Sequence, residues 1–525
     1  MKKIIALDTE DDSCGNVHII NFFDGREHMT FSGKNMHLDA WIFLKKLPKN
    51  SEVWACNLEY DLINVFGDWL GSMCTLQYTK GGLIKATFRD RPGLIFRDTL
   101  RHWPIGVKAM GEIINLPKMD VDGDYINEEY CRRDTEIVWR FVMLMIERYD
   151  ELDLTVKSTL PAMTLELLEK FFPIPRGAIS AELQEFFRGG YYGGRVEVFD
   201  LNENHGVNYY DVNSLYPSVM ALGQYPDLSD YIETKNPTFE REGMANVELE
   251  YPESYVCGLP VRMNEIIYPY GRLSGTWTYP EIRQALRDGA HIVRVNKAIE
   301  FRRTCRPFQD YINFCYKKRL DAKKQNDRLG DVFWKLFMNS TYGKFGQGGE
   351  LMMIYDDREI SIDSNASHVN VIWAAYVTAY GRLRLLNELR SVDPLYCDTD
   401  SIFTPDVMPT GPGLGELKLE GKFTKTRFIG NKIYLLENEK ERIEKAKGIN
   451  KSVAGDFIRT GRAVFKKPMR YRESRKSIAG IANKWYNVER NNNKHYLKRR
   501  ILPNGNTEPW KIHEFEQLEF LKKEF

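Results

Sequence analysis

The stretch YCDTDSIF, residues 396–403, places two acidic side chains one residue apart inside a run that otherwise favours a β-strand. Successive side chains of a strand point to opposite faces, so Asp398 and Asp400 are predicted to share one face of a sheet. A tight turn is the alternative, because Asp, Thr and Ser side chains readily bond to nearby backbone groups. Crowded carboxylates in a strand instead indicate a divalent cation such as Mg²⁺, which takes ligand oxygens from carboxylates and phosphates.

A second acid lies in a segment that suits phosphate. The sequence YYDVNSLYPSVM, residues 209–220, is typical of a strand, a turn and a helix, with Asp211 at the end of the strand. The backbone amides from Asn213 to Tyr216 are then expected at or near the start of the helix, and Pro217 suits its first turn. Free amides and the positive end of the helix dipole favour a bound phosphate. A metal-plus-phosphate site is therefore predicted here, with a simple turn role for Asp211 as the alternative.

The segment KLFMNSTYGKFG, residues 335–346, is predicted to be helical. Lys335, Asn339 and Tyr342 follow one another at helical spacing, so they are expected on one face. A cation, an amide and an aromatic ring on one face suit contact with a triphosphate and a base better than burial in a core. Lys323, on the preceding predicted helix, is a further candidate phosphate contact.

Acidic side chains also recur near the start of the chain. The sequence IALDTE places Asp8 and Glu10 one residue apart on a predicted strand, and NLEYD ends in Asp61. In YCRRDTEIV, Tyr130 and Asp134 lie one helical turn apart on the same face. Each of these acids taken alone is typical of an ordinary surface, so their significance depends on whether they come together.

Length and charge limit the class of protein. A chain of 525 residues is too long for one ordinary domain, so three or more lobes are expected. The net charge is only +1, but residues 421–525 carry 26 basic and 12 acidic side chains. Basic residues interleaved with aromatic rings in this segment indicate nucleic acid as the partner, with a solvated basic surface as the alternative. The eight scattered cysteines and the lack of a long apolar run predict a reduced, cytoplasmic protein without a membrane span.

The motifs YYDVNSLYPS, KLFMNSTYG and YCDTDS, in that order, resemble motifs A, B and C of family B DNA polymerases. The resemblance implies a template-directed polymerase that adds dNTPs to a primer 3′-OH by two-metal phosphoryl transfer. Two Mg²⁺ or Mn²⁺ ions would be bound by Asp211, Asp400 and the backbone of Val212, with Asp398 as a neighbouring acid. Tyr216 would be the steric gate against ribonucleotides, and the other predicted nucleotide contacts are Leu215, Lys323, Lys335, Asn339 and Tyr342.

The N-terminal acids together resemble the three motifs of the 3′–5′ proofreading exonucleases that precede the polymerase domain in this family. The resemblance implies a second pair of metal ions, bound by Asp8, Glu10, Asp61 and Asp134. Tyr130 would orient the attacking water, and Lys118 would be an auxiliary lysine. The frayed single-stranded 3′ end would be held by Asn57, Tyr60, Thr99 and Leu100.

The same resemblance implies an α/β multidomain fold. An RNase H-like exonuclease domain would precede a right-hand polymerase with a ferredoxin-like palm, helical fingers and a small basic thumb. The predicted boundaries are 1–185 for the exonuclease, 186–257 for the first part of the palm, 258–309 for an insertion that contacts a priming protein, 310–345 for the fingers, 346–368 for a short second insertion, 369–450 for the second part of the palm and 451–525 for the thumb.

Within the family, the chain resembles the compact protein-primed group of phages and linear plasmids, because the first exonuclease motif begins almost at residue 1. FRGG, with Gly189 and Gly190, resembles the linker motif YxGG of that group, and YYGG at residues 191–194 is a competing match. Lys432 and Tyr434 match its KxY motif, which is expected to contact the primer terminus. A monomer acting on primer–template DNA is expected, primed by a terminal protein or, alternatively, by nucleic acid. A second alternative is an exonuclease or DNA-binding relic with an inactive palm.

Overall fold

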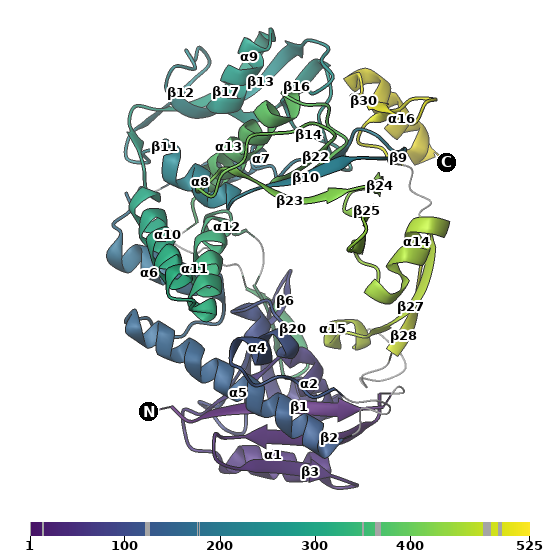
Figure 1. The fold of residues 1–525 in the computed structure, drawn as a ribbon. Helices are drawn as coiled ribbons and strands as arrows, with labels where there is room; N and C mark the ends of the chain where they lie inside the picture. Colours follow the sequence, from purple (N-terminus) through teal and green to yellow (C-terminus); the bar gives the residue numbers. More distant parts are fainter. Residues whose placement is uncertain are drawn as a thin grey trace.

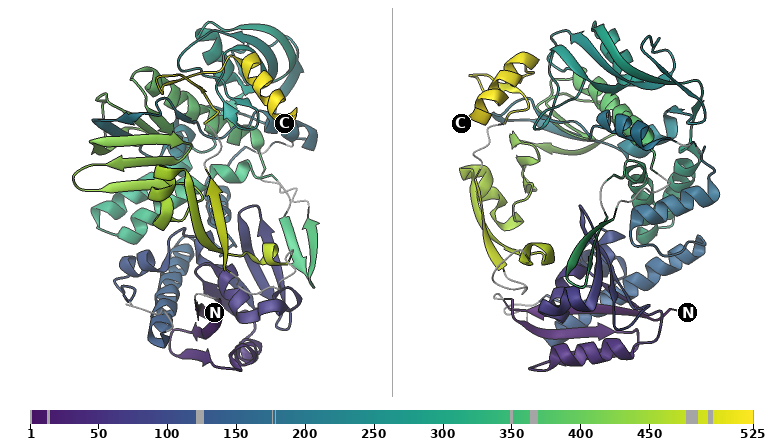
Figure 2. Two further views of the ribbon diagram at one scale, coloured as in Figure 1. Left: turned by 90° about the vertical axis from the view of Figure 1, so that its right-hand side faces the viewer. Right: turned by 180° about the vertical axis from the view of Figure 1, so that it is seen from behind.

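The computed structural model describes the chain except residues 1, 13–14, 121–126, 176, 178, 349–350, 363–368, 476–484, 492–495 and 525, and except the side chains of 519–524. Figures 1 and 2 show lobes arranged around a central region, with the N-terminal domain at the bottom of Figure 1 and the palm at the top. None of the helices in the described part of the chain combines the length and apolar composition that a bilayer crossing requires.

The N-terminal domain is built on a sheet with the strand order β20-β19-β5-β6-β7-β4-β1-β2-β3. The central strands β1, β4 and β7 are parallel, so their carboxyl ends lie at one edge of the sheet. The long helix α5 packs against β1 and β2. The strands are β1 (Ile4–Asp11), β2 (Val17–Phe23), β3 (His28–Ser32), β4 (Glu52–Ala55), β5 (Cys74–Thr79), β6 (Gly82–Phe88) and β7 (Ile95–Asp98). The helices are α1 (Met36–Lys46), α2 (Leu58–Phe66), η1 (Gly67–Trp69), α3 (Leu70–Met73), η2 (Thr99–Arg101), α4 (Val107–Ile113) and α5 (Glu128–Glu151).

Two strands of this sheet come from far along the chain. The hairpin of β19 (Leu351–Tyr355) and β20 (Arg358–Ile362) extends the edge of the N-terminal sheet, because β19 pairs with β5. These strands belong to the segment 346–368 that the sequence predicts as a short second insertion. The insertion is therefore part of the N-terminal sheet, although residues 349–350 and 363–368 lie outside the described residues.

The palm contains an antiparallel sheet with the strand order β23-β10-β22-β21-β8. Leu385 and Leu389 of helix α13 belong to one buried apolar cluster with Tyr210, Cys397 and Ile402 of the sheet, so the helix covers one face. The elements are β8 (Val196–Val198), β10 (Val207–Val212), α8 (Leu215–Leu222), α13 (Val371–Arg390), β21 (Tyr396–Asp398), β22 (Ser401–Thr404) and β23 (Leu417–Phe423).

The fingers are an antiparallel helix pair that packs on α6 and α8. Asp327 begins the second helix, since its carboxylate accepts a hydrogen bond from the backbone amide of Gly330 at 2.9 Å. The helices in this region are α6 (Leu160–Phe171), α7 (Ala181–Gly189), α10 (Gln309–Lys324), α11 (Arg328–Ser340) and α12 (Tyr342–Phe345).

A second, four-stranded sheet has the order β12-β17-β13-β16. It crosses the predicted boundary at 257/258, because β13 pairs with both β16 and β17 along its length. The structural unit therefore begins before β12 rather than at 258. Its elements and neighbours are β11 (Tyr225–Pro226), β12 (Tyr231–Thr234), β13 (Glu242–Tyr251), β14 (Val261–Arg262), β15 (Ile266–Ile267), β16 (Gly271–Thr278), α9 (Tyr279–Arg287), β17 (His291–Phe301) and β18 (Thr304–Cys305).

The basic C-terminal segment divides into two parts. The described residues among 451–491 form the thumb, whereas Ile512 and Phe515 of α16 are buried in the core of the four-stranded sheet. The predicted thumb, 451–525, is therefore too long at its C-terminal end. The elements are β9 (Glu203–Asn204), β24 (Lys425–Gly430), β25 (Ile433–Glu437), β26 (Arg442–Ala446), η3 (Lys451–Val453), α14 (Ala454–Thr460), β27 (Arg462–Pro468), α15 (Tyr471–Ser474), β28 (Trp485–Asn491), β29 (Arg500–Ile501), β30 (Thr507–Glu508) and α16 (Ile512–Glu524).

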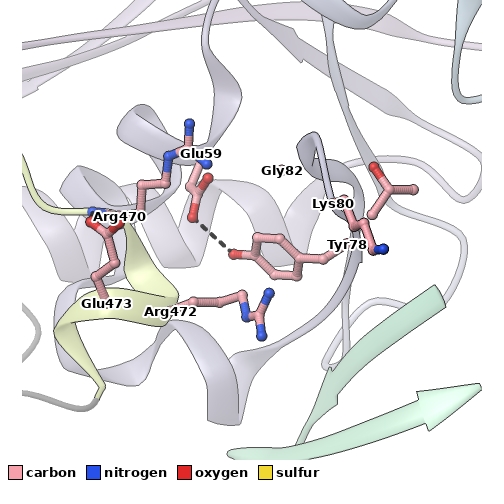
Figure 3. A pocket seen from close by; sticks show the side chains of 8 residues that line it. Glu59, Tyr78, Lys80, Gly82, Arg470, Arg472 and Glu473 are labelled. Atoms are coloured by element: carbon pink, nitrogen blue, oxygen red, sulfur yellow. Dashed lines mark hydrogen bonds between the residues drawn. The ribbon is translucent and has the colours of Figure 1, made fainter. Parts of the chain in front are cut away.

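The tip of the thumb touches the N-terminal domain. The backbone amide of Tyr471 donates to the carboxylate of Glu59 at 3.2 Å, and its hydroxyl donates to Asp357 of the β19–β20 hairpin at 3.3 Å. Figure 3 shows the pocket beside this contact, where the hydroxyl of Tyr78 also donates to Glu59. On the fingers side, Arg148 of α5 pairs with Asp327 at 2.7 Å. The N-terminal domain thus contacts both the thumb and the fingers.

Candidate active sites

Two acids meet at the centre of the palm sheet. Asp211 lies near the end of β10, and the backbone amide of Val212 donates to the carbonyl of Asp400 at 2.8 Å, which ties the two motifs together. Burial, followed by the charges of Asp400 and Glu420, raises the pKa of Asp211 to about 7. Burial also raises the pKa of Asp400. Such raised values are typical of carboxylates gathered at a functional site.

The prediction that Asp398 and Asp400 share one face of a strand is wrong, and the alternative of a tight turn is confirmed. Strand β21 ends at Asp398, and Thr399 has a φ of 65°, so Asp400 lies in a tight turn before β22. The amide of Asp400 donates to the carbonyl of Asp398 at 2.7 Å across this turn. Asp398 is 7% exposed and pairs with the ammonium of Lys432 at 2.6 Å. A lysine therefore compensates Asp398, and the turn directs Asp400 toward Asp211.

The turn after Asp211 differs in part from its prediction. Helix α8 begins at Leu215 after Ser214, whose φ of 54° places it in the left-handed region. The amide of Asn213 donates to the carbonyl of Glu416 at 2.9 Å, so it is not free for a phosphate as predicted. Leu215 is buried, and the ring of Tyr216 lies 4.5 Å from the ring of Tyr342.

The structure brings most of the predicted motif B residues to the two palm acids. Lys335 is exposed on α11, and its charge lowers the pKa of both Asp211 and Asp400, although burial outweighs this effect. The side-chain amide of Asn339 donates to the carbonyl of Lys335 at 2.7 Å. Lys323 lies exposed in the last turn of α10, and none of the described interactions joins it to either acid.

The two glycine motifs occupy different places. A Cβ on Gly194 of YYGG would lie 2.7 Å from the side chain of Thr399 and 3.0 Å from the hydroxyl of Tyr216. A Cβ on Gly190 of FRGG would instead meet Met244 of the four-stranded sheet at 2.6 Å, and Gly189 ends α7. YYGG is therefore the glycine motif beside the palm acids.

Arg382 of α13 holds the YYGG loop, and no sequence motif predicted this role. Its buried guanidinium donates to the carbonyls of Tyr192 at 2.7 Å and Gly193 at 2.9 Å, and it pairs with Glu281 at 2.7 Å.

The KxY residues, Lys432 and Tyr434, lie near Asp398, whose carboxylate pairs with the ammonium of Lys432. The amide of Lys432 donates to the hydroxyl of Tyr396 at 2.9 Å, whereas Tyr434 is packed against Tyr396 and is 6% exposed.

The four predicted acids of the N-terminal domain gather at one place. Asp8 and Glu10 come from β1, Asp61 from α2 and Asp134 from α5. Burial is the largest cause that raises the pKa of each, and mutual repulsion adds to it at Asp8, Glu10 and Asp61. One oxygen of Asp8 and one of Asp134 are buried without a hydrogen-bond partner among the described residues. Such a donor set fits a divalent cation, because buried acceptor oxygens are otherwise costly.

Neighbouring side chains orient these acids. Lys118 pairs with Asp134, and its ammonium lies 4.5 Å from the ring centre of Tyr130. The hydroxyl of Thr9 donates to Asp61 at 2.7 Å. The thiol of Cys131 lies with oxygens of Asp8 and Glu10 in a group whose ligand atoms are all within 4.8 Å of one another. Thr9 and Cys131 were not predicted, because only the fold brings them to the acids.

The predicted single-strand contacts lie beside these acids. Asn57 follows β4 with a φ of 73°, in the left-handed region, and Thr99 and Leu100 follow β7. The hydroxyl of Tyr60 donates to the carboxylate of Asp11 at 2.6 Å. Because β4 and β7 are parallel neighbours, both loops emerge at the same edge of the sheet.

A cationic pocket of about 940 Å³ lies between the N-terminal domain and the fingers. No carboxylate is present among the described residues that line it. Burial lowers the pKa of Lys85 and Lys344, which line it with other cations. Its positive side chains are Lys80, Lys85, Arg97, Arg101, Lys157 and Lys344. This composition suits a polyanion such as a DNA strand.

Comparison with known proteins places the chain in a family. Residues 113–378 match the family model of DNA polymerase type B, organellar and viral. The DNA-directed DNA polymerase of Enterobacteria phage PRD1 is 27% identical over 379 residues, which cover 65% of this chain and 66% of the relative. The DNA polymerase of Acidianus bottle-shaped virus is 29% identical over 375 residues, covering 66% of this chain and 53% of the relative. The chain thus spans about half to two thirds of the length of these relatives.

A solved structure shares the fold. Phi29 DNA polymerase complexed with primer-template DNA and incoming nucleotide substrates superimposes with a TM-score of 0.73 at 16% identity, over 93% of this chain and 99% of that chain. The likeness confirms the predicted α/β multidomain fold, in which an exonuclease-type domain precedes a right-hand palm, fingers and thumb. The matched family model covers about half of the chain, including Asp211 and Lys335. The chain therefore belongs to the organellar and viral type B DNA polymerases.

Proposed function

We propose that this protein is a template-directed DNA polymerase that extends a primer 3′-OH with dNTPs. The observation that carries the proposal is the convergence of Asp211, Asp400 and Lys335, which come from three separate segments of the chain. An inactive relic is the alternative, and the presence of all three residues with the expected charge environment argues against it. A purified chain that extended no primed template in Mg²⁺ would overturn the proposal.

The palm residues have separable tasks in this reaction. Two bound Mg²⁺ or Mn²⁺ ions would activate the primer hydroxyl and stabilise the leaving pyrophosphate. Asp211, Asp400 and the backbone of Val212 would hold those ions, and Lys335 would neutralise charge on the triphosphate. Tyr216 and Tyr342 would form the floor of the nucleotide site. Lys432, which is bound to Asp398, would steady the primer terminus beside Asp400.

We propose a second activity, 3′–5′ exonuclease, at the N-terminal acids. One buried oxygen of Asp8 and one of Asp134 have no hydrogen-bond partner among the described residues, which supports a metal site there. With Glu10 and Asp61 they would hold two ions that activate water. Tyr130 would position that water, while the ammonium of Lys118 would hold Asp134 in place and oppose the rise of its pKa that burial causes.

The contacts between lobes support an enclosed path for DNA. The thumb tip bound to Glu59 and Asp357 would close the molecule around the primer–template duplex. The cationic pocket beside Lys344 would receive the template strand. The primer source stays a prediction, either a terminal priming protein or nucleic acid. Extension of an annealed DNA oligonucleotide, compared with nucleotide transfer to a protein hydroxyl, would distinguish the two.

Replacing Tyr216 with alanine is expected to admit ribonucleotides. The ring lies against Tyr342, and removing it opens the space where a 2′-hydroxyl would otherwise collide. We expect the preference for dNTP over rNTP, measured as the ratio of kcat/KM values, to fall by about 10²-fold. Tyr216→Phe keeps the ring and should retain the preference. Unchanged sugar selection in Tyr216→Ala would refute the gate role.

The cluster of N-terminal acids is expected to make the Tm of the protein depend on pH and on Mg²⁺. Burial and the charge of Asp134 raise the pKa of Glu10 from 4.5 to about 8. Between these values the folded state binds protons that the unfolded chain has released, so the free energy of unfolding falls as pH rises through this window. Metal-free protein should therefore have a higher Tm at pH 6 than at pH 8, and Mg²⁺ should raise the Tm more at pH 8.

Glu10→Gln is the matched control for this pH dependence, because it removes the titrating group and keeps the shape. It should raise the metal-free Tm at pH 8 and reduce the difference between the two pH values. A variant as sensitive to pH and Mg²⁺ as the wild type would contradict the assignment of the effect to this cluster.

A further inference from the structure

A buried carboxylate outside the four acids joins the two loops that carry the expected single-strand contacts. Asp98 is the last residue of β7 and is 4% exposed. Its Oδ1 atom accepts two hydrogen bonds, one from the amide of Asn57 at 3.1 Å and one from the amide of Leu100 at 2.9 Å. The same oxygen thus holds the loop after β4 and the loop after β7.

The sheet explains why one side chain can reach both loops. Strands β4 and β7 run parallel, and their last residues, Ala55 and Asp98, are paired. The chain must then turn sharply into α2, and Asn57 does so in the left-handed region with a φ of 73°. Backbone amides at such a turn have no partner within the sheet or the helix, so a side-chain acceptor is needed to fix them.

We infer that Asp98 is a positioning residue that fixes the two single-strand-binding loops relative to each other, and the inference rests on the proposed exonuclease function. Asp98 differs from the metal-binding acids, because its hydrogen bonds face backbone amides. The other carboxylate oxygen of Asp98, Oδ2, lies 4.0 Å from Nε of the Arg101 guanidinium. The carboxylate therefore acts through Asn57 and Leu100, and it orders the protein groups that receive the 3′ end before the strand arrives.

The test compares Asp98→Ala with Asp98→Asn in the full chain. Asparagine keeps an oxygen at the same distance from both amides, whereas alanine leaves both amides without this acceptor. We expect Asp98→Ala to raise the KM for a short single-stranded oligonucleotide by about 10-fold to 100-fold, with a smaller change in kcat. Asp98→Asn should restore the KM to within about threefold of wild type. Asp39→Ala, an exposed carboxylate on α1 of the same domain, is the matched control and should change neither value.

Three outcomes would overturn the inference: Asp98→Ala behaving like wild type, Asp98→Asn being as impaired as Asp98→Ala, or a loss of kcat at unchanged KM, which would indicate a metal ligand. Polymerase activity retained in each variant would exclude general misfolding.

Hydrogen exchange at the amides of Asn57 and Leu100 tests the positioning role of Asp98 independently of nuclease activity. We expect faster exchange in Asp98→Ala alone. If the wild type degrades no DNA, the exonuclease proposal fails, while this exchange result still decides whether Asp98 fixes the two loops. Equal protection in all variants would refute it.

Discussion

Asp400→Ala should reduce nucleotide addition by about 10³-fold or more, because it removes one of the two side chains that would hold both metal ions. The turn around Thr399 places this carboxylate toward Asp211, and the charge of Asp400 is the largest Coulombic contribution that raises the pKa of Asp211. The rate should be measured in a single turnover with a labelled primer and saturating dNTP. Degradation of the same primer without dNTPs should continue at the wild-type rate.

Asp398→Asn is the matched comparison for that variant, since it lies in the same hairpin two residues away. Its carboxylate is already bound by Lys432, so we expect a smaller loss of nucleotide addition. Equal loss in the two variants would contradict the division of roles. Loss of both synthesis and degradation in Asp400→Ala would indicate misfolding or a wrong assignment of the two sites.

Replacing Asp8 and Glu10 together with alanine should abolish primer degradation, by about 10³-fold or more, while nucleotide addition persists. Both side chains leave β1 beside Asp134, and their removal takes away half of the carboxylates in the N-terminal site. Degradation of a labelled single strand in Mg²⁺ measures the effect. Degradation that persisted in the double variant would contradict the nuclease assignment.

A matched control for the double variant is Asp39→Asn together with Asp90→Asn, two exposed carboxylates of the same domain. Neither side chain belongs to the four acids or to the predicted single-strand contacts, so degradation should stay near the wild-type rate. Extension rates for both double variants should match wild type.

The sequence predicted the two sites well where each one depended on short-range spacing. Asp8 with Glu10 on a strand, Tyr130 with Asp134 on a helix, and the strand–turn–helix after Asp211 all have the structure that local periodicity predicts. The fold class was also predictable, because the ordered motifs resemble a polymerase family and that resemblance implied its fold.

The failures have physical reasons. The pattern around Asp398 alternates like a strand, but Thr399 adopts a positive φ and turns the chain, which periodicity alone does not reveal. Arg382 orders the YYGG loop from almost two hundred residues away, and Asp98 joins two loops through parallel strand pairing. The hairpin β19–β20 was predicted as an insertion, but its pairing with β5 depends on a sheet edge formed by distant sequence.

The most direct test uses purified protein, Mg²⁺, a primed DNA template and a labelled primer, with and without the four dNTPs. Two separate active sites predict extension of the primer when dNTPs are present and shortening when they are absent. Shortening under both conditions, with no extension at any dNTP concentration, would mean an inactive palm and would contradict the polymerase assignment.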